Sequence, residues 1–231
     1  MSKILEVKNL TVSLAGEEVI KNLSFQVQKG DFLTILGPNG TGKTVLLKTL
    51  LGFITDYAGE INWTGKTRVG YLPQGLTREK VGDMPLSVLE FLSLKNKNKK
   101  EIQEYLELVG VKDPKFLSKK IGDLSGGQFQ RMLMVWALFD EPEILFFDEP
   151  TTGIDIKGEE TVYNLLHKLQ KEKGLTIILI THDVNVVYKH SSDVLCMSGD
   201  YSCYSKPEEI MDPKKLEEIY GMPVKFYKHN H

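Results

Sequence analysis

Eight consecutive residues, from Gly37 to Thr44, have the composition and spacing of a phosphate-binding loop. Their sequence, GPNGTGKT, matches G-x-x-x-x-G-K-[ST] at every fixed position. The glycines let the backbone curl until several N–H groups face one point, where the following helix N-terminus adds partial positive charge. Lys43 can then reach β- and γ-phosphates, and the Thr44 hydroxyl is placed to ligate Mg²⁺. The loop therefore predicts β- and γ-phosphates and Mg²⁺ as ligands, held by Gly37, Pro38, Asn39, Gly40, Thr41, Gly42, Lys43 and Thr44.

The same eight residues are also compatible with an ordinary glycine turn between a strand and a helix. Two adjacent carboxylates further along the chain argue against that alternative. Asp148 and Glu149 directly follow four large apolar residues, 144–147. Asp148 is suited to hold Mg²⁺ through its water shell, and Glu149 can orient or deprotonate an attacking water. A simple polar exit from a strand would need only one of these acids, so the pair favours phosphoryl chemistry.

A serine and two glycines just before a predicted helix form a third candidate site. The residues are Ser125, Gly126, Gly127 and Gln128. Backbone N–H groups, a hydroxyl and the helix dipole together make an anion-binding position. The alternative is a helix cap in which Ser125 accepts a hydrogen bond from the first turn. A cap alone does not require the residues that follow Ser125, so we favour a phosphate-binding role.

Alternating strand and helix patterns surround these motifs and indicate an α/β fold. Strands are expected at 4–8, 19–28, 32–36, 59–63, 69–74, 144–147, 175–180, 194–197 and 201–204, the last two forming a hairpin around Gly199 and Asp200. Helices are expected at 45–51, 86–92, 102–109, from about 128, 157–172 and after 207. The charged run 95–100 is expected to be a solvated loop. Residues 75–123 therefore indicate a small helical insertion into the α/β core.

The composition is that of an ordinary globular protein. The 231 residues are 41% hydrophobic and 26% charged, with a net charge of −2, which gives no support to sequence-independent binding of nucleic acid. Cys196 and Cys203 do not make a disulfide framework or a metal-ligand spacing, so a reducing compartment is expected. No signal-peptide core opens the chain, and no apolar run approaches the roughly 20 residues of a membrane span. Any membrane role must therefore come through a partner.

With these motifs in order, the chain resembles the ATPase subunits of ABC transporters over essentially its whole length. The family's sequence of motifs is present: phosphate loop, Q-loop glutamine (Gln74), signature LSGGQFQR (124–131), Walker B acids, D-loop (153–155) and switch histidine (His182). The resemblance implies a P-loop NTPase fold of the ABC-ATPase type, with a mixed sheet core, an N-terminal antiparallel β subdomain and a helical subdomain. It implies one ATPase domain over 1–231, with core and β subdomain at 1–74 and 124–205, helical subdomain at 75–123 and tail at 206–231.

The resemblance also implies roles for single residues. Lys43, Gln74, Glu149 and His182 would form the catalytic set, with His182 at the γ-phosphate. Thr44, Gln74 and Asp148 would hold Mg²⁺, and Gln74 would link nucleotide state to the helical insertion. Two subunits would sandwich two ATP molecules head to tail, so that Ser125, Gly126, Gly127, Gln128 and Asp155 act across the dimer. The family's usual adenine-stacking aromatic is absent; its place falls near Leu14. Trp136 stands where arginine is common, and Asp193 is expected at the surface.

Within the family, the resemblance is closest to the ATPases of zinc or manganese importers. It is carried by the segments 70–74, 84–88, 153–158 and 193–197. It implies integral-membrane permease subunits as partners, an extracytoplasmic substrate-binding protein acting indirectly, no nucleic acid, and a peripheral location on the cytoplasmic face of the membrane. The alternatives are the ATPase of a siderophore, haem or cobalamin importer and a soluble ABC ATPase for cofactor assembly. A P-loop kinase would not explain the LSGGQ sequence.

Overall fold

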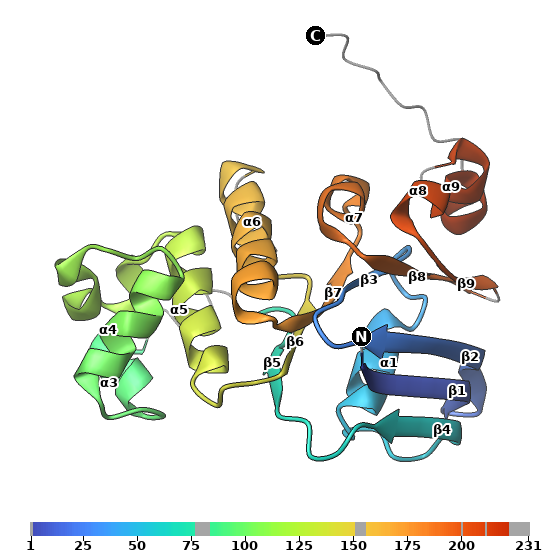
Figure 1. Cartoon of the computed structure of the whole chain (residues 1–231), viewed down its shortest axis with the longest axis horizontal. Coiled ribbons are helices and arrows are strands. Elements are labelled where there is room, and N and C mark those ends of the chain that lie inside the picture. The colour runs from blue at the N-terminus through green and yellow to red at the C-terminus, as the bar shows by residue number, and fades with distance from the viewer. Residues whose placement is uncertain (1, 77–83, 151–155, 200, 211, 222–231) are drawn as a thin grey trace, which may run out of the picture. The chain divides into compact units, whose positions relative to one another are not determined.

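The computed structural model describes residues 2–76, 84–150, 156–199, 201–210 and 212–221, with only the backbone at 156–159. The chain divides into two compact units, and Figure 1 labels the helices and strands. The first contains residues 1–66 and 178–231, and the second contains residues 67–177. Within the described residues, no helix has both the length and the apolar composition needed to cross a membrane.

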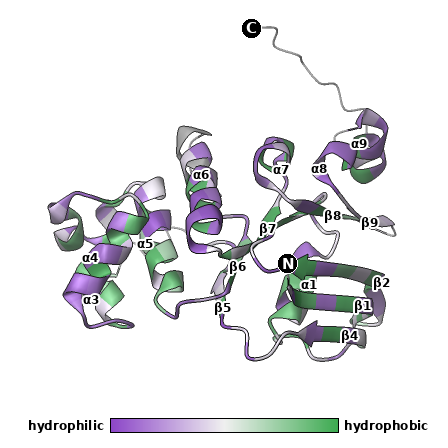
Figure 2. Ribbon diagram, viewed as in Figure 1, coloured by the Kyte–Doolittle hydropathy of each residue, from purple (hydrophilic) through white to green (hydrophobic). Residues whose placement is uncertain are grey.

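An antiparallel sheet of three strands forms one part of the first unit. Its order is β2 (Glu17–Gln28), β1 (Lys3–Leu14), β4 (Ala58–Trp63). Figure 2 shows hydrophilic and hydrophobic residues alternating along these strands, which is the pattern of a sheet with one buried face. The three strands confirm the predicted positions. β1 is longer than predicted because register shifts let it continue past Asn9, whose φ is 49°.

A second group of strands in this unit positions the phosphate loop. β3 (Phe32–Leu36) is buried at every residue and pairs in parallel with β8 (Asp193–Ser198), which pairs antiparallel with β9 (Tyr201–Ser205). On its other side β3 neighbours β7 (Thr176–Thr181), which crosses the boundary between the units. Helix α1 (Lys43–Leu50) follows the loop. Strand, loop and helix thus occur as predicted.

Three short helices complete the first unit. These are α7 (Val184–His190), α8 (Pro207–Ile210) and α9 (Pro213–Tyr220). Their apolar side chains pack with those of β3 and β8 in one buried cluster: Leu36, Val187, Val194, Cys196, Ile210, Leu216 and Ile219. A helical tail after residue 207 was predicted, whereas α7 was not, because two turns are too short to show a periodic pattern.

The two cysteines form a disulfide that the sequence did not predict. Cys196 on β8 and Cys203 on β9 lie directly opposite each other in the hairpin register, and their Cα atoms are 4.9 Å apart. Cys196 has no exposed surface, and Cys203 is partly buried. The number and spacing of the cysteines did not indicate this bond; the register of the predicted hairpin brings them together.

The second unit holds a parallel pair of strands and four of the described α-helices. β5 (Val69–Leu72) and β6 (Ile144–Asp148) pair in parallel. Helices α3 (Val88–Ser93), α4 (Lys99–Leu108), α5 (Gly126–Leu138) and α6 (Ile156–Lys173) occur where helices were expected, together with 3-10 turns at Pro114–Ser118 and Ile121–Asp123. The charged run is not all loop, because Asn98 caps α4 and Lys99 and Lys100 open it.

Candidate functional site

The phosphate loop begins where the buried strand β3 ends. Gly37 is required there by close packing, because a Cβ atom at this position would lie 1.9 Å from the backbone oxygen of Met197 on β8. Gly42, the last residue before α1, has a φ of 90°, and a Cβ there would approach Val19 to 2.9 Å. A side chain is therefore excluded at Gly37 by packing, and at Gly42 it is disfavoured by both the positive φ and the contact with Val19.

Lys43 is held by its own loop. Its Nζ donates hydrogen bonds of 2.8 Å to the backbone oxygen of Gly37 and 2.6 Å to that of Pro38. The side chain is 6% exposed. The Thr41 hydroxyl donates a third bond within the loop, of 3.0 Å to the Pro38 oxygen. The loop is therefore closed on its lysine, and Thr44, in the first turn of α1, is partly buried beside it.

Gln74 and Glu149 are brought together in the second unit. The amide Nε2 of Gln74 donates a 2.9 Å hydrogen bond to Oε2 of Glu149. Glu149 has a φ of 47°, in the left-handed region that few residues other than glycine adopt. Such strain is often found at functional positions. Gln74 is exposed and Glu149 partly so, and the pair is accessible to solvent.

Asp148 ends β6 and is almost completely buried, at 2% exposure. Burial raises the pKa of the Tyr71 phenol on β5, and the negative charge of Asp148 raises it further. The adjacent carboxylates thus differ in environment. Asp148 is fixed within the sheet, whereas Glu149 has turned out of it.

The signature residues lie at the start of α5. The Ser125 side chain accepts a 3.3 Å hydrogen bond from the Gln128 backbone N–H, and the Gln128 side chain accepts one of 3.1 Å from the Ser125 N–H. This is a capping box. The helix cap considered as the alternative is therefore present, and Gln128, which we did not expect to take part in it, completes it. Gly126 and Gly127 take no part in these side-chain bonds, and a Cβ at Gly127 would meet nothing within 4 Å.

His182 follows β7, as predicted, and its side chain is exposed. Its backbone oxygen accepts a 3.3 Å hydrogen bond from the Tyr220 hydroxyl on α9. Burial raises the pKa of Tyr220 to about 12, with the charge of Asp183 as a second cause. The phenol therefore stays protonated at neutral pH and ties α9 to the residue after β7.

The predicted site residues are divided between the two units. Lys43, Thr44 and His182 belong to the first unit, and Gln74, Ser125, Asp148 and Glu149 belong to the second. Asp155 lies outside the described residues. Leu14, at the predicted adenine position, is the last residue of β1 and is 39% exposed.

Two residues have structural roles that the sequence did not reveal. Asp193, expected at the surface, is buried at 8% exposure and accepts a 2.7 Å hydrogen bond from Lys206 Nζ. Trp136 packs on Phe91, with ring centroids 4.7 Å apart, and the Lys95 ammonium lies 5.5 Å from its ring centroid. An aromatic residue at position 136 is therefore explained by its contacts with α3 and the residues that follow it.

A cavity of about 610 Å³ in the second unit lies away from Asp148. It is lined in part by Tyr105, Leu138, Glu141 and Pro142. Glu141 and Pro142 precede β6, whereas Asp148 ends it. The cavity is therefore at the opposite end of that strand and does not belong to the candidate site.

Comparison with known proteins places these motifs in a family context. The model of the ABC transporter family matches residues 20–152. The chain is 37% identical over 224 residues to the "Probable metal transport system ATP-binding protein" of Thermotoga maritima, covering 94% of this chain and 90% of the relative. It is 33% identical over 236 residues, the whole of both chains, to the zinc import ATP-binding protein ZnuC of Wigglesworthia glossinidia brevipalpis. Among solved structures, cbiO1 of Clostridium perfringens, part of the ABC transporter complex cbiONQ, superposes with a TM-score of 0.80 at 25% identity, covering 94% of each chain.

Proposed function

The chain belongs to the ABC transporter family as one of its ATP-hydrolysing subunits, and from this premise we propose that it powers uptake of a divalent metal ion, zinc or manganese, through a separate membrane permease. The observation that carries the proposal is similarity over nearly the whole chain to relatives named for metal transport and zinc import. The predicted subdomain boundaries, 1–74 with 124–205, 75–123 and 206–231, remain part of this proposal.

The phosphate loop binds the ATP phosphates in this mechanism. The Lys43 ammonium now donates to the backbone oxygens of Gly37 and Pro38. Phosphate oxygens are stronger acceptors for an ammonium than neutral carbonyls, so ATP can take over these donors. Backbone N–H groups from Gly37 to Thr44 and the N-terminus of α1 add to the attraction. ATP binding therefore requires the loop to release its own lysine.

Glu149 acts as the group that orients or deprotonates the attacking water. Gln74 positions it, because the hydrogen bond from Nε2 holds Oε2 of the carboxylate. Oxygen donors from Thr44, Gln74 and Asp148 suit Mg²⁺, a hard cation, and the Gln74 Oε1 is available for this role because Nε2 bonds Glu149. Bound Mg²⁺ would neutralise phosphate charge during hydrolysis. Lys43 and His182 would offset the charge that develops on the γ-phosphate.

A second copy of the chain completes each nucleotide site in this proposal. The two subunits sandwich ATP head to tail, so that the γ-phosphate faces the signature residues 125–128 of the partner subunit. Asp155 acts across the same interface. In support, Gly126 and Gly127 open α5 and take no part in the side-chain cap, which leaves the glycine backbone as a surface for phosphate.

The homodimer would bind integral-membrane permease subunits from the cytoplasmic side, as a peripheral protein. An extracytoplasmic substrate-binding protein would take part indirectly, and nucleic acid would not be a partner. In this arrangement the transported metal is cargo of the permease. The donor set proposed for Mg²⁺ is built of oxygen atoms, which suits a resident hard cation and contains none of the Cys or His donors that favour zinc.

Total cell metal, measured by elemental mass spectrometry, tests the proposal. The host carries Lys43→Ala as its only copy and grows with limiting metal. Loss of zinc or manganese alone, restored by an excess of that metal, is the expected result and identifies the cargo. Unchanged zinc and manganese with falling iron or cobalt would contradict it and support a chelate importer. No change in any metal would contradict both and support an assembly role.

A further inference from the structure

The disulfide between Cys196 and Cys203 lies next to the strand that leads into the phosphate loop. In the parallel pairing of β3 and β8, Leu36 is the partner of Cys196, so the next residues on each strand are Gly37 and Met197. Gly37 packs so closely on the backbone oxygen of Met197 that no side chain would fit between them. Cys196 is therefore followed directly by Met197, whose backbone oxygen packs against the first residue of the phosphate loop.

The two cysteines differ in access. Cys196 is completely buried in the cluster that also contains Leu36, Ile210, Leu216 and Ile219, whereas Cys203 packs at the edge of that cluster and is partly exposed. Of the two residues, Cys203 is therefore the one at which attack by a small-molecule thiol is expected. Attack at Cys203 would release Cys196 into apolar surroundings, which disfavour a thiolate.

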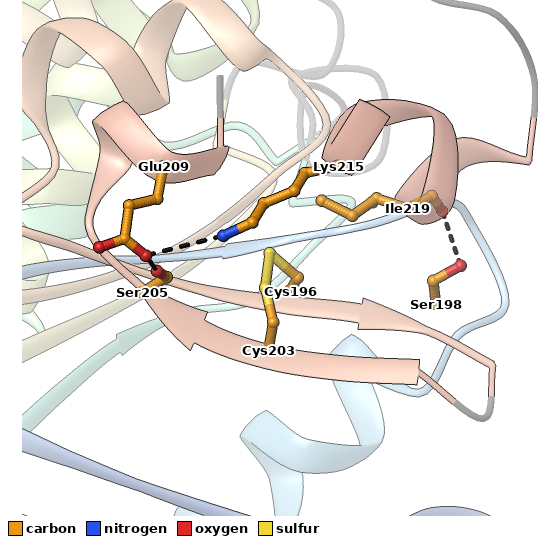
Figure 3. Close-up of a disulfide and its surroundings, with 7 residues drawn as sticks. All are labelled: Cys196, Ser198, Cys203, Ser205, Glu209, Lys215 and Ile219. Atoms are coloured by element: carbon orange, nitrogen blue, oxygen red, sulfur yellow. Dashed lines mark hydrogen bonds and ion pairs between the residues drawn. A yellow bond between two sulfur atoms is a disulfide. The ribbon is translucent and has the colours of Figure 1, made fainter. Parts of the chain in front are cut away.

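The C-terminal helices hold the other side of the disulfide. Figure 3 shows the bond beneath α8 and α9, with Ser198, Ser205, Glu209 and Lys215 around it. The Ser198 hydroxyl on β8 donates a 2.6 Å hydrogen bond to the backbone oxygen of Ile219 on α9. Glu209 on α8 is 3.6 Å from Lys215 Nζ on α9 and accepts a hydrogen bond from the Ser205 hydroxyl on β9. The face of the hairpin that carries the disulfide is thus bonded to both α8 and α9, so a change at the sulfurs is transmitted to the packed neighbours.

We propose that Cys196 and Cys203 are a reversible thiol–disulfide pair that exchanges with thiols of the glutathione class, and that the disulfide favours the loop conformation in which Lys43 bonds the Gly37 and Pro38 oxygens. The disulfide therefore opposes binding of ATP, and the dithiol permits it. This inference rests on the proposed role of Lys43 in binding phosphate.

The exchange balances in two steps. A glutathione thiolate attacks the Cys203 sulfur, the bond between the two cysteines breaks, and the Cys196 thiolate that leaves takes up a proton. A second glutathione thiolate attacks the glutathione sulfur of this mixed disulfide and releases the Cys203 thiolate. Overall, one protein disulfide and two glutathione molecules give one protein dithiol and one glutathione disulfide. Oxidation is the reverse, with glutathione disulfide as the oxidant.

Packing provides the coupling to the loop. Two sulfurs that are no longer bonded have to move apart to van der Waals separation, and a closely packed interior resists such a change in volume without a shift of its neighbours. Leu36, in the same cluster, directly precedes Gly37, and the Met197 oxygen borders it. Movement of β8 in the dithiol form therefore loosens the contact between the Met197 oxygen and Gly37, one of the two residues whose oxygens bond Lys43.

The experiment compares the two redox states of the full chain. Protein equilibrated with glutathione disulfide or with dithiothreitol is checked by thiol counting in denaturant, and its Kd for a non-hydrolysable ATP analogue with Mg²⁺ is measured by calorimetry. We expect the disulfide form to bind at least threefold more weakly. Because coupling is reciprocal, saturating analogue should shift the glutathione equilibrium toward dithiol by the same factor.

Cys203→Ser provides the matched control, because it keeps a small side chain and cannot form the disulfide. Its Kd should equal that of the reduced chain and be insensitive to glutathione disulfide. Equal Kd values for the two states of the unsubstituted chain, tighter binding by the disulfide form, or failure of glutathione disulfide to oxidise the pair would each overturn the proposal. These comparisons use the unsubstituted chain, so they stand even if the variant does not fold. If neither state binds the analogue, the role proposed for Lys43 fails as well, which separates the two conclusions.

Discussion

Gln74 and Glu149 lie 75 residues apart in the sequence and are joined by a 2.9 Å hydrogen bond. The register of two parallel strands explains their meeting. Leu72 on β5 is paired with Phe147 on β6, and each of the two residues follows its strand's paired position by two. The left-handed backbone of Glu149 then turns its carboxylate toward the amide. A residue expected to sense nucleotide state therefore holds the candidate catalytic base.

Removal of the Gln74 amide should impair turnover more than binding. Gln74→Ala leaves Glu149 without the donor that orients it, so we expect kcat to fall by about 10–100-fold while ATP affinity changes by less than about threefold. Steady-state hydrolysis and equilibrium binding would separate the two effects. Gln103→Ala is the matched control, because Gln103 donates a similar bond to Glu107 on the exposed face of α4. An unchanged kcat in Gln74→Ala would contradict the positioning role.

Substitution of Glu149 itself should abolish turnover and preserve binding. Glu149→Gln keeps the shape of the side chain but removes the basic carboxylate, and we expect hydrolysis to fall by about 10²–10⁴-fold. The variant should accumulate as an ATP-bound dimer, detectable by light scattering coupled to size-exclusion chromatography. Glu172→Gln, at an exposed carboxylate of α6, serves as the control. Normal hydrolysis by Glu149→Gln would show that another group activates the water.

A methyl group at Gly37 should damage both the fold and the loop. The Cβ of Gly37→Ala would lie 1.9 Å from the Met197 oxygen, so β3 and β8 would have to separate. We expect Tm to fall by about 5–10 °C and nucleotide binding to be lost. Gly16→Ala is the control, since Gly16 also has a positive φ but a Cβ there meets nothing within 4 Å. It should cost only about 2–4 °C, and an equal loss in both variants would refute the packing argument.

The buried carboxyl of Asp31 should make stability depend on pH. Burial is the main cause that raises its pKa, and the nearby Asp193 adds to it, while hydrogen bonding from the Gln28 N–H and the charge of Lys206 act in the opposite direction. A raised folded-state pKa contributes stability that is complete below the ordinary value near 3.8 and is lost as pH rises through the folded value. Asp31→Asn should therefore raise Tm at pH 7 by about 1–3 °C.

Thermal unfolding between pH 4 and pH 8 provides the measurement for Asp31. The difference in Tm between Asp31→Asn and the unsubstituted chain should shrink toward pH 4, because the raised pKa increases the protonated fraction of the folded-state carboxyl as pH falls and the advantage of the amide decreases. Asp56→Asn, at an exposed position, should show no such trend. A variant that is less stable than the unsubstituted chain at pH 7 would show that attraction to Lys206 outweighs the cost of burial.

Local patterns in the sequence were sufficient to predict most elements and the candidate residues. The buried strand, glycine loop and helix around Lys43, the acids that end β6, and the hairpin of β8 and β9 all occur at the predicted places. These features depend on strand alternation, apolar runs and turn residues within a few positions of one another. The short helix α7 and the capping role of Gln128 were missed because their local patterns also fit other structures.

Only the tertiary structure decided which of these residues meet. The bond between Gln74 and Glu149 requires the parallel register of β5 and β6, the disulfide requires the register of β8 and β9, and the burial of Asp193 requires Lys206 beside it. The physical reason is that strand pairing joins segments far apart in the chain, and its register is selected by the burial of whole faces and not by any short motif. The sequence by itself determined the chemical groups and their order; packing between distant strands determined their partners.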